Sequence, residues 1–361
     1  MDLLIIGGTR FLGRHLAGQA LADGHRVTLL NRGRSGPGLF PEAEHLVADR
    51  DADLSVLGGR QWDAALDTCA YFPRQVRALA GQLAGQVGQY QLVSSISAYA
   101  GFAHPGVNED SPVIQLDDTE SATTITGDNY GGLKVACELA ALDGFGSACL
   151  IARPGLIVGP HDPTGRWTWW VQRLLRSGEV LAPGAPDTPV QFIDARDIAA
   201  WMLHQAEQAH QGVFNLNGPD SPLTMGDWLA GMHAALASTA HFTWVDEAFV
   251  LGQGVQPWSD LPVWLPRENE AMHEVDCTRA RDSGLVCRPL AQTALDTAAW
   301  LATPSAVCRT VTCRRSGSAR GAARVRRGRS SARIMVSELP ASATPSGPVS
   351  RPSAIYRVEN G

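Results

Sequence analysis

Short apolar runs and stretches with helical apolar spacing alternate along the first half of the chain. The runs predict buried strands over residues 3–6, 27–30, 46–48, 62–66, 90–93 and 148–152, and the stretches between them predict helices over 11–21, 74–87 and 130–142. Strands that alternate with helices in this way are typical of βαβ units. We therefore predict the α/β class, with a Rossmann-type, doubly wound parallel sheet that carries helices on both faces.

The pattern loosens after Arg153. It predicts a Gly/Pro-rich loop over 154–166, helices over 167–175 and 196–209, and short strands over 191–193, 213–216 and near 242–245. We expect residues 1–160 to form the sheet domain, completed by parts of 190–220. Residues 161–302 then form a smaller C-terminal lobe that binds substrate over the carboxyl edge of the sheet, where open α/β sheets bind ligands.

The charge is divided unevenly between the body of the chain and its end. Eleven of the 30 basic residues and two of the 36 acidic residues fall in 301–361, so this segment carries +9 and residues 1–300 carry −15. The segment is rich in Ser, Ala, Gly and Pro and contains no tryptophan, so we predict a disordered Arg/Ser-rich tail over 303–361. An acidic body is a poor partner for nucleic acid.

The composition excludes several other classes of protein. With 361 residues, 44% of them hydrophobic, the chain is neither fibrous nor wholly disordered, and no apolar stretch approaches the eighteen or so residues that span a bilayer. The start MDLLIIGG lacks the basic leader of a signal peptide. Seven scattered cysteines without a CxxC pair predict reduced thiols, a cytoplasmic location and no metal site.

The first candidate site is the turn that follows the first predicted strand. Its residues are Gly7, Gly8, Thr9, Arg10, Phe11, Leu12 and Gly13. Glycines at a strand-to-helix turn let backbone N–H groups and a helix N-terminus approach a pyrophosphate. A purely structural turn is the alternative, and the usual GxGxxG fingerprint would require glycine in place of Arg10.

The second signal is Tyr130, which is followed four residues later by Lys134, the one lysine of the chain. This spacing places both side chains on one face of a helix. An ammonium beside a phenol stabilises the phenolate and so favours proton transfer near neutral pH. An incidental pair on a surface helix is the alternative.

Serines form the third signal, at the end of the strand over 90–93. A hydroxyl of the Ser94–Ser97 run would lie at the ligand-binding edge and could donate to a substrate carbonyl. Serines at strand ends also serve as ordinary caps and turn formers.

Taken together, these elements resemble the extended or atypical branch of the short-chain dehydrogenase/reductase superfamily, the NAD-dependent epimerases and dehydratases, in a subgroup marked by GGTRFLG. The resemblance covers about residues 1–300 and includes SSxxxY over 94–99 and RPGxxxGP over 153–160. It implies that Tyr130 is the acid/base, that Lys134 holds the ribose and tunes Tyr130, and that Ser95 polarises the substrate carbonyl.

The same resemblance implies further contacts with the cofactor. Asp49 and Arg50 would contact the adenine, and Pro154 and Gly155 would pass beside the nicotinamide. The remaining residues predicted at the cofactor are Thr68, Cys69 and Ser94.

The end of the second strand bears on the choice of cofactor. Enzymes that prefer NAD usually carry an acidic residue there, whereas this chain has Asn31 and Arg32, with Arg34 close behind. Arg32, together with Arg10, could bind a 2′-phosphate, so we predict NADP. The alternative is NAD, with Asn31 as the ribose partner and the arginines in solvent.

We accordingly predict a homodimeric NAD(P)-dependent reductase or epimerase whose substrate is a sugar nucleotide or a small ketone. Reduction and epimerisation use the same residues and stay open, while the missing Thr-Asp-Glu run disfavours dehydration. A non-catalytic dinucleotide sensor or scaffold, or an RNA-binding protein on the same fold, is the alternative. Trp167, Trp169 and Trp170 are interpreted as core rather than as a stacking surface, and the loop residues His161, Asp162 and Arg166 as either substrate contacts or solvated side chains.

Overall fold

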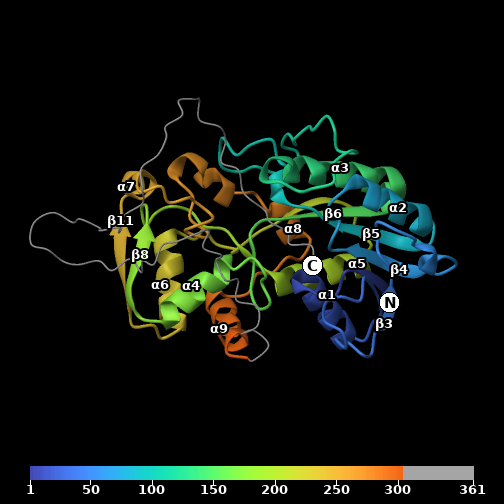
Figure 1. Ribbon diagram of the computed structural model, residues 1–361, viewed down its shortest axis with the longest axis horizontal. Coiled ribbons are helices and arrows are strands. Elements are labelled where there is room, and N and C mark those ends of the chain that lie inside the picture. The colour runs from blue at the N-terminus through green and yellow to red at the C-terminus, as the bar shows by residue number, and fades with distance from the viewer. Residues whose placement is uncertain (304–361) are drawn as a thin grey trace, which may run out of the picture.

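A seven-stranded, wholly parallel sheet forms the larger part of the structure, a computed structural model that describes residues 1–303 (Figure 1). Its order from edge to edge is β10 (Gly212–Leu216), β6 (Cys149–Pro154), β5 (Val87–Val93), β4 (Trp62–Asp67), β1 (Asp2–Ile6), β2 (Arg26–Asn31) and β3 (Glu44–Val47). The chain winds outward from β1 in both directions, so the predicted doubly wound Rossmann-type sheet is confirmed.

Helices cover both faces of this sheet. On one face lie α1 (Phe11–Ala22) and α5 (Ala195–Gln208), and on the other lie α2 (Pro73–Leu83) and α3 (Gly127–Phe145). In β1, Leu3 and Ile5 pack under the first pair, while Leu4 and Ile6 pack under the second. A strand that is apolar at every position is therefore what a sheet buried on both faces requires.

A second hydrophobic core lies beside the sheet, on the left of Figure 1. It is built from α4 (Arg166–Leu175), β8 (Gly178–Pro183), α6 (Met225–Ala235), β11 (Ala240–Val245), α7 (Glu247–Gly252) and α9 (Leu290–Leu301). β8 and β11 pair in parallel. Trp167 and Trp170 are fully buried in this core, as predicted, while Trp169 remains 37% exposed.

The remaining elements are short. They are η1 (Ser55–Leu57), η2 (Ile96–Ala98), η3 (Gly146–Ala148), β7 (Ile157–Val158), β9 (Ile193–Asp194), η4 (Arg267–His273) and α8 (Thr278–Asp282). β7 pairs with β9 outside the main sheet. β10 instead returns to the sheet and pairs with β6, so residues far apart in sequence share its edge.

Some predicted boundaries are wrong. The helix predicted over 74–87 ends at Leu83, because Gly85 turns the chain with φ 75° and Val87 enters β5. β7 and β8 were not predicted, since a two-residue strand and a strand with exposed Gly178 and Glu179 carry little apolar signal. The tail predicted over 303–361 lies, beyond Thr303, outside the described residues. Within residues 1–303, no helix is both long and apolar enough to cross a membrane.

The N-terminal end of α3 approaches the end of β5 very closely. A Cβ atom on Gly131 would lie 2.1 Å from the backbone oxygen of Ser97, and one on Gly132 would lie 2.7 Å from the Leu116 side chain. Glycine at these positions therefore lets the helix that carries Tyr130 pack directly on the segment that carries Ser95.

We expect Gly131→Ala to lower the free energy of unfolding by about 1–3 kcal/mol, because the added methyl group meets a backbone carbonyl that cannot turn away. Gly81→Ala in α2 is the matched control. Its Cβ would meet nothing within 4 Å, so it should raise the stability by roughly 0.5–1 kcal/mol through helix propensity. Urea unfolding measures both, and equal effects of the two variants would contradict the close approach.

Candidate active site

The glycine turn after β1 leaves no room for side chains. Gly7 and Gly8 have φ values of 110° and 81°, and a Cβ on Gly7 would lie 2.6 Å from Oγ1 of Thr68. A Cβ on Gly13 would lie 2.7 Å from the backbone nitrogen of Gly8. The start of α1 is thereby pressed against the turn, and Leu12 is buried below it. Thr9, also buried, pairs with Ser35 across the turn through their hydroxyls at 2.9 Å.

The N-terminus of α1 lacks a side-chain cap. Its N-cap residue, Arg10, is extended and makes no capping hydrogen bond, and the first turn contains no acidic residue. Phe11, the first helical residue, has φ 36°. Backbone N–H groups at an uncapped helix N-terminus bind anions well, so this turn suits a pyrophosphate.

Asn31 and Arg32 follow β2 beside this turn. The Asn31 oxygen Oδ1 accepts from the backbone N–H of Gly33 at 2.8 Å, while its Nδ2 is buried without a partner among residues 1–303. Arg32 is exposed. An amide donor and a cation, with no carboxylate at this position, suit an acceptor such as a ribose oxygen or a phosphate.

Arg50 lies over the end of β4 and is engaged with a buried carboxylate. Its two terminal nitrogens contact the two oxygens of Asp67 at 2.8 and 2.7 Å, and the hydroxyl of Tyr90 donates to Oδ2 of Asp67 at 2.8 Å. Burial would raise the pKa of Asp67, but Arg50 and these hydrogen bonds hold it below its ordinary value. The backbone N–H of Cys69 completes the network at 3.1 Å. Asp49 caps the turn before it by accepting from the N–H of Asp51.

A second buried ion pair joins α3 to the sheet. Arg153 of β6 binds Glu138 of α3 through two contacts of 2.9 and 2.6 Å, and both side chains are about 95% buried. The hydroxyl of Ser94 also donates to Glu138. Ser94, predicted at the cofactor, therefore directs its hydroxyl into this network. The guanidinium of Arg153 also lies 4.8 Å from the centre of the Tyr99 ring.

Lys134 is 4% exposed and reaches the carboxyl ends of two neighbouring strands. Its Nζ donates to the backbone oxygens of Ala70 and Val93, each at 2.8 Å. It also lies 5.2 Å from the centre of the Tyr71 ring, whose pKa is raised by burial and lowered in part by the charge of Lys134. Tyr130, one turn before Lys134, is half-buried. This arrangement places an ammonium where the ends of β4 and β5 meet the serine segment, residues 94–97.

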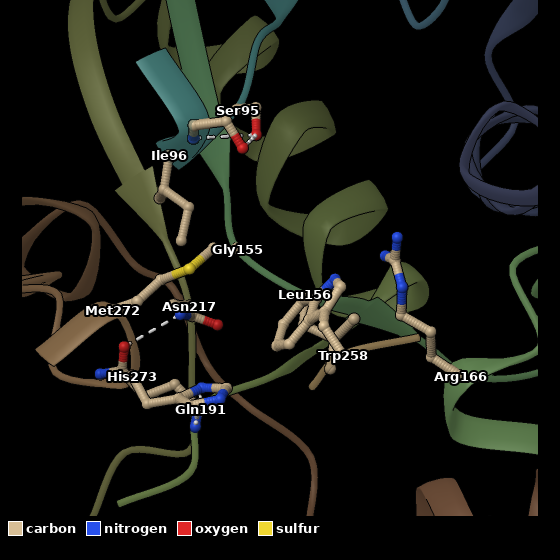
Figure 2. A pocket seen from close by; sticks show the side chains of 11 residues that line it. Ser95, Ile96, Gly155, Leu156, Arg166, Gln191, Asn217, Trp258, Met272 and His273 are labelled. Carbon is tan, nitrogen blue, oxygen red and sulfur yellow. Dashed lines mark hydrogen bonds between the residues drawn. The ribbon is translucent and has the colours of Figure 1, made fainter. Parts of the chain in front are cut away.

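Ser95 lines a cavity at this edge. Its Oγ accepts from the backbone N–H of Ser97 at 3.1 Å and contacts Oγ of Ser97 at 3.2 Å. About 340 Å³ beside this lining is free of protein atoms, and part of that space is open to solvent. Figure 2 shows its lining, which is Ser95, Ile96, Ser97, Gly155, Leu156, Arg166, Gln191, Asn217, Trp258, Met272 and His273. Of the predicted site residues it contains Ser95 and Gly155. Pro154 ends β6 just before it.

His273 is held as a neutral ring. Its Nδ1 accepts from the backbone N–H of Gln191 at 3.1 Å, so Nε2 carries the proton that is donated to the oxygen of Val263 at 2.9 Å. Burial lowers its pKa to about 4. His273 thus shapes the wall of the cavity and does not take up protons near neutral pH.

Three residues before or at the start of α4 were predicted either to contact substrate or to be solvated, and the structure places them differently. Arg166 lines the cavity, and Asp162 is 4% exposed with one oxygen that has no partner within residues 1–303. Burial raises the pKa of Asp162 to about 6. His161 instead faces away and contacts the rings of His15 and Trp300. Within the described chain, no group of three or more His, Cys, Asp or Glu could hold a metal ion.

Sequence reasoning missed most of the polar cavity lining. Gln191, Asn217 and His273 come from separate segments and carry no local motif, so only the fold brings them together. Arg166 was among the residues considered, and its position at the start of a predicted helix after a Gly/Pro loop was the available signal. Asp67 is the last residue of β4 and Tyr71 follows four residues later, so both could have been found as polar residues at a strand end.

Comparison with protein families and curated sequences gives a consistent result. The model of the NAD dependent epimerase/dehydratase family matches residues 3–216. The epimerase family protein SDR39U1 of Bos taurus is 27% identical over 256 residues, which cover 66% of this chain and 82% of that protein. The chloroplast stem-loop binding protein of 41 kDa b of Arabidopsis thaliana is 25% identical over 229 residues, which cover 60% and 58% of the two chains.

Solved structures share the fold. The Bordetella bronchiseptica enzyme WbmH in complex with NAD+ superimposes with a TM-score of 0.60 at 17% identity, covering 83% of this chain and 98% of that one. Human SDR39U1 with NADPH gives a TM-score of 0.58 at 22% identity, covering 83% and 99%. At these identities the likeness concerns the arrangement of sheet and helices.

We expect His273 to titrate near pH 4 rather than near its ordinary value of 6.5. Since the folded protein holds the neutral ring, burial of this ring contributes fully to the free energy of unfolding above pH 6.5. This contribution is lost as the pH falls towards 4. The loss is of the order of 3 kcal/mol. Imidazole NMR signals followed against pH measure the titration. A midpoint near 6.5 would show that the ring is not buried as the structure places it.

Proposed function

The chain belongs to the NAD dependent epimerase/dehydratase family, and from this membership we propose that it is an NAD(P)-dependent reductase or epimerase with Tyr130 as its acid/base. The observation that carries the proposal is the placement of Lys134. Its ammonium is fixed by Ala70 and Val93 at the edge where α3 meets the serine segment. An ammonium held in this way would stabilise the phenolate of a tyrosine that must release and regain a proton.

The residues present fit a nicotinamide dinucleotide. The glycine turn and the uncapped N-terminus of α1 would hold the pyrophosphate, and the free Nδ2 of Asn31 would donate to the adenine ribose or to a phosphate on it. Asp49 is proposed at the adenine. Arg50 would act indirectly, since its guanidinium already pairs with Asp67 and orders the turn through Thr68 and Cys69.

The nicotinamide end is assigned to the residues around the cavity. Lys134, Pro154 and Gly155 would face it, with Ser95 on the substrate side. When bound, the cofactor exchanges a hydride with a carbonyl or alcohol carbon of the substrate. The Ser95 hydroxyl would donate to the carbonyl oxygen, and Tyr130 would give that oxygen a proton or take one from it. The charge of Lys134 favours the phenolate state between these transfers.

Reduction and epimerisation use this same set of groups. In a reduction the alcohol product is released, whereas in an epimerisation an alcohol carbon is first oxidised to a carbonyl and then reduced again on its other face. The dinucleotide-sensor alternative does not account for the Tyr130–Lys134 spacing on α3 or for the Ser95 hydroxyl at the cavity. RNA binding has support in one relative that is named for stem-loop binding, but the −15 charge of residues 1–300 opposes it.

We further propose NADP as the cofactor, with NAD as the alternative. Arg32 is exposed beside Asn31, no acidic side chain occupies the end of β2, and the human relative is described with NADPH. A homodimer is also proposed, since Leu139 and Leu142 are 62% and 42% exposed on α3. Membership of the GGTRFLG subgroup stays a prediction.

We expect Tyr130→Phe to lower turnover at least about 100-fold, because it removes the hydroxyl and little else. Binding of NADPH, measured by fluorescence titration, should stay within about twofold of that of the unchanged protein. Tyr71→Phe is the matched control and should retain turnover, although Tyr71 also lies beside Lys134. Near-normal turnover in Tyr130→Phe would reject Tyr130 as the acid/base.

We expect Arg32→Ala to weaken NADPH binding about tenfold and to leave NADH binding within about twofold, because only NADPH carries the 2′-phosphate. Arg26→Ala is a control on the same strand, since Arg26 is exposed and pairs with Asp2 at its far end. Dissociation constants for both cofactors decide the matter. Equal affinities in the unchanged protein, or tighter NADH binding, would refute the preference.

A further inference from the structure

The side-chain amide of Asn217 leaves one buried oxygen unused at the cavity. Asn217 is 1% exposed, and its Oδ1 has no hydrogen-bond partner among residues 1–303. A buried acceptor without a donor costs stability unless a ligand supplies one. Figure 2 shows this oxygen directed away from Gln191, towards the side of the cavity formed by Leu156 and Trp258.

The orientation of the Asn217 amide is fixed by groups whose polarity is certain. The backbone N–H of Val275 donates to Oε1 of Gln191 at 3.0 Å, and Nε2 of Gln191 donates to the backbone oxygen of Val275 at 3.1 Å. The Gln191 amide cannot be reversed without losing both bonds. Asn217 contacts Oε1 of Gln191 at 2.9 Å and must therefore present its nitrogen there. The atom left for the cavity is an acceptor.

Arg166 gives the cavity its charge. At neutral pH it is the charged residue of the cavity lining, since the lining contains no carboxylate and His273 is held neutral. Its guanidinium lies 5.3 Å from the centre of the Trp258 ring, which forms the adjoining wall. The buried carboxyl group of Asp162 lies outside the cavity lining and interacts with this charge.

Trp258 is itself held in an unusual conformation. Its φ is 65°, in the left-handed region that a bulky side chain rarely adopts. The ring contacts His273 on one side, at 5.7 Å between centres, and Arg166 on the other. Strained backbone of this kind collects at binding sites.

We propose that Asn217 and Arg166 select the substrate: Asn217 accepts a hydrogen bond from a substrate hydroxyl, and Arg166 binds an anionic group. The substrate class is then a small hydroxy-carbonyl compound that carries a carboxylate or a phosphate. The proposal rests on the proposed function, because Ser95 on the same cavity is taken as the partner of the carbonyl. It narrows the predicted range of sugar nucleotides and small ketones to anionic members.

The test is binding to the NADPH-loaded protein by calorimetry, with glucuronate and glucose 6-phosphate as the two anionic probes and glucose as the neutral one. We expect binding of at least one anion and markedly weaker binding of glucose; the two anions separate a carboxylate from a phosphate. Arg166→Met should lower the affinity for the anion about 10- to 100-fold and leave the affinity for glucose unchanged. Arg173→Met is the matched control, since Arg173 lies on the same helix but donates to the backbone oxygens of Ser177 and Glu179.

Asn217→Ala should lower the affinity for the bound anion about tenfold. Among analogues of that anion that each lack one hydroxyl, one should bind the variant and the unchanged protein with equal affinity, because it lacks the hydroxyl that Asn217 recognises. Equal anion affinity in Arg166→Met, or equal affinity in a folded Asn217→Ala, would overturn the proposal. A loss of NADPH affinity in Asn217→Ala would also overturn it, because the oxygen would then serve the cofactor. Failure of the unchanged protein to bind NADPH at all would instead reject the proposed function.

Discussion

The buried pair of Glu138 and Arg153 is the interaction on which the site depends. Two charges removed from water cost several kcal/mol each, and the cost is offset only when the geometry is good and the remaining hydrogen bonds are made. Here Arg153 binds both carboxylate oxygens, and the Ser94 hydroxyl adds a third donor. The pair joins α3 to the ends of β5 and β6, and in doing so it fixes where the first turns of α3 can lie.

Those first turns bring the reactive side chains to the edge of the sheet. The absence of a side chain at Gly131 lets α3 lie against the Ser97 carbonyl, and Lys134 reaches the carbonyls of Ala70 and Val93. The carboxyl ends of parallel strands expose such oxygens in one row. A single lysine can therefore join two strand ends, and its charge is set where the proposed chemistry needs it.

Most of the buried polar groups named along this edge have a partner, but Nε of Arg50 and Nη1 of Arg153 have none among residues 1–303. Asp67 is satisfied by Arg50 and Tyr90, and His273 by two backbone groups. The groups without a partner in the described chain include Nδ2 of Asn31 at one end and Oδ1 of Asn217 at the other. They lie near the two places where a dinucleotide and a substrate are proposed to bind, and between them lies the uncapped start of α1.

The sequence by itself determined the sheet, because a strand buried on both faces is mostly apolar and a tight strand-to-helix turn requires glycine. It also determined that Tyr130 and Lys134 lie one turn apart on a single helix, which depends only on spacing, and that Trp167 and Trp170 are buried. The cavity was decided by the tertiary structure. Gln191, Asn217 and His273 lie on segments more than twenty residues apart, and the role of each follows from a hydrogen bond to another of them or to a backbone group of a distant segment. Local patterns encode which residues are buried, but the atoms left unpaired in a cavity depend on contacts that form only when the whole chain has folded.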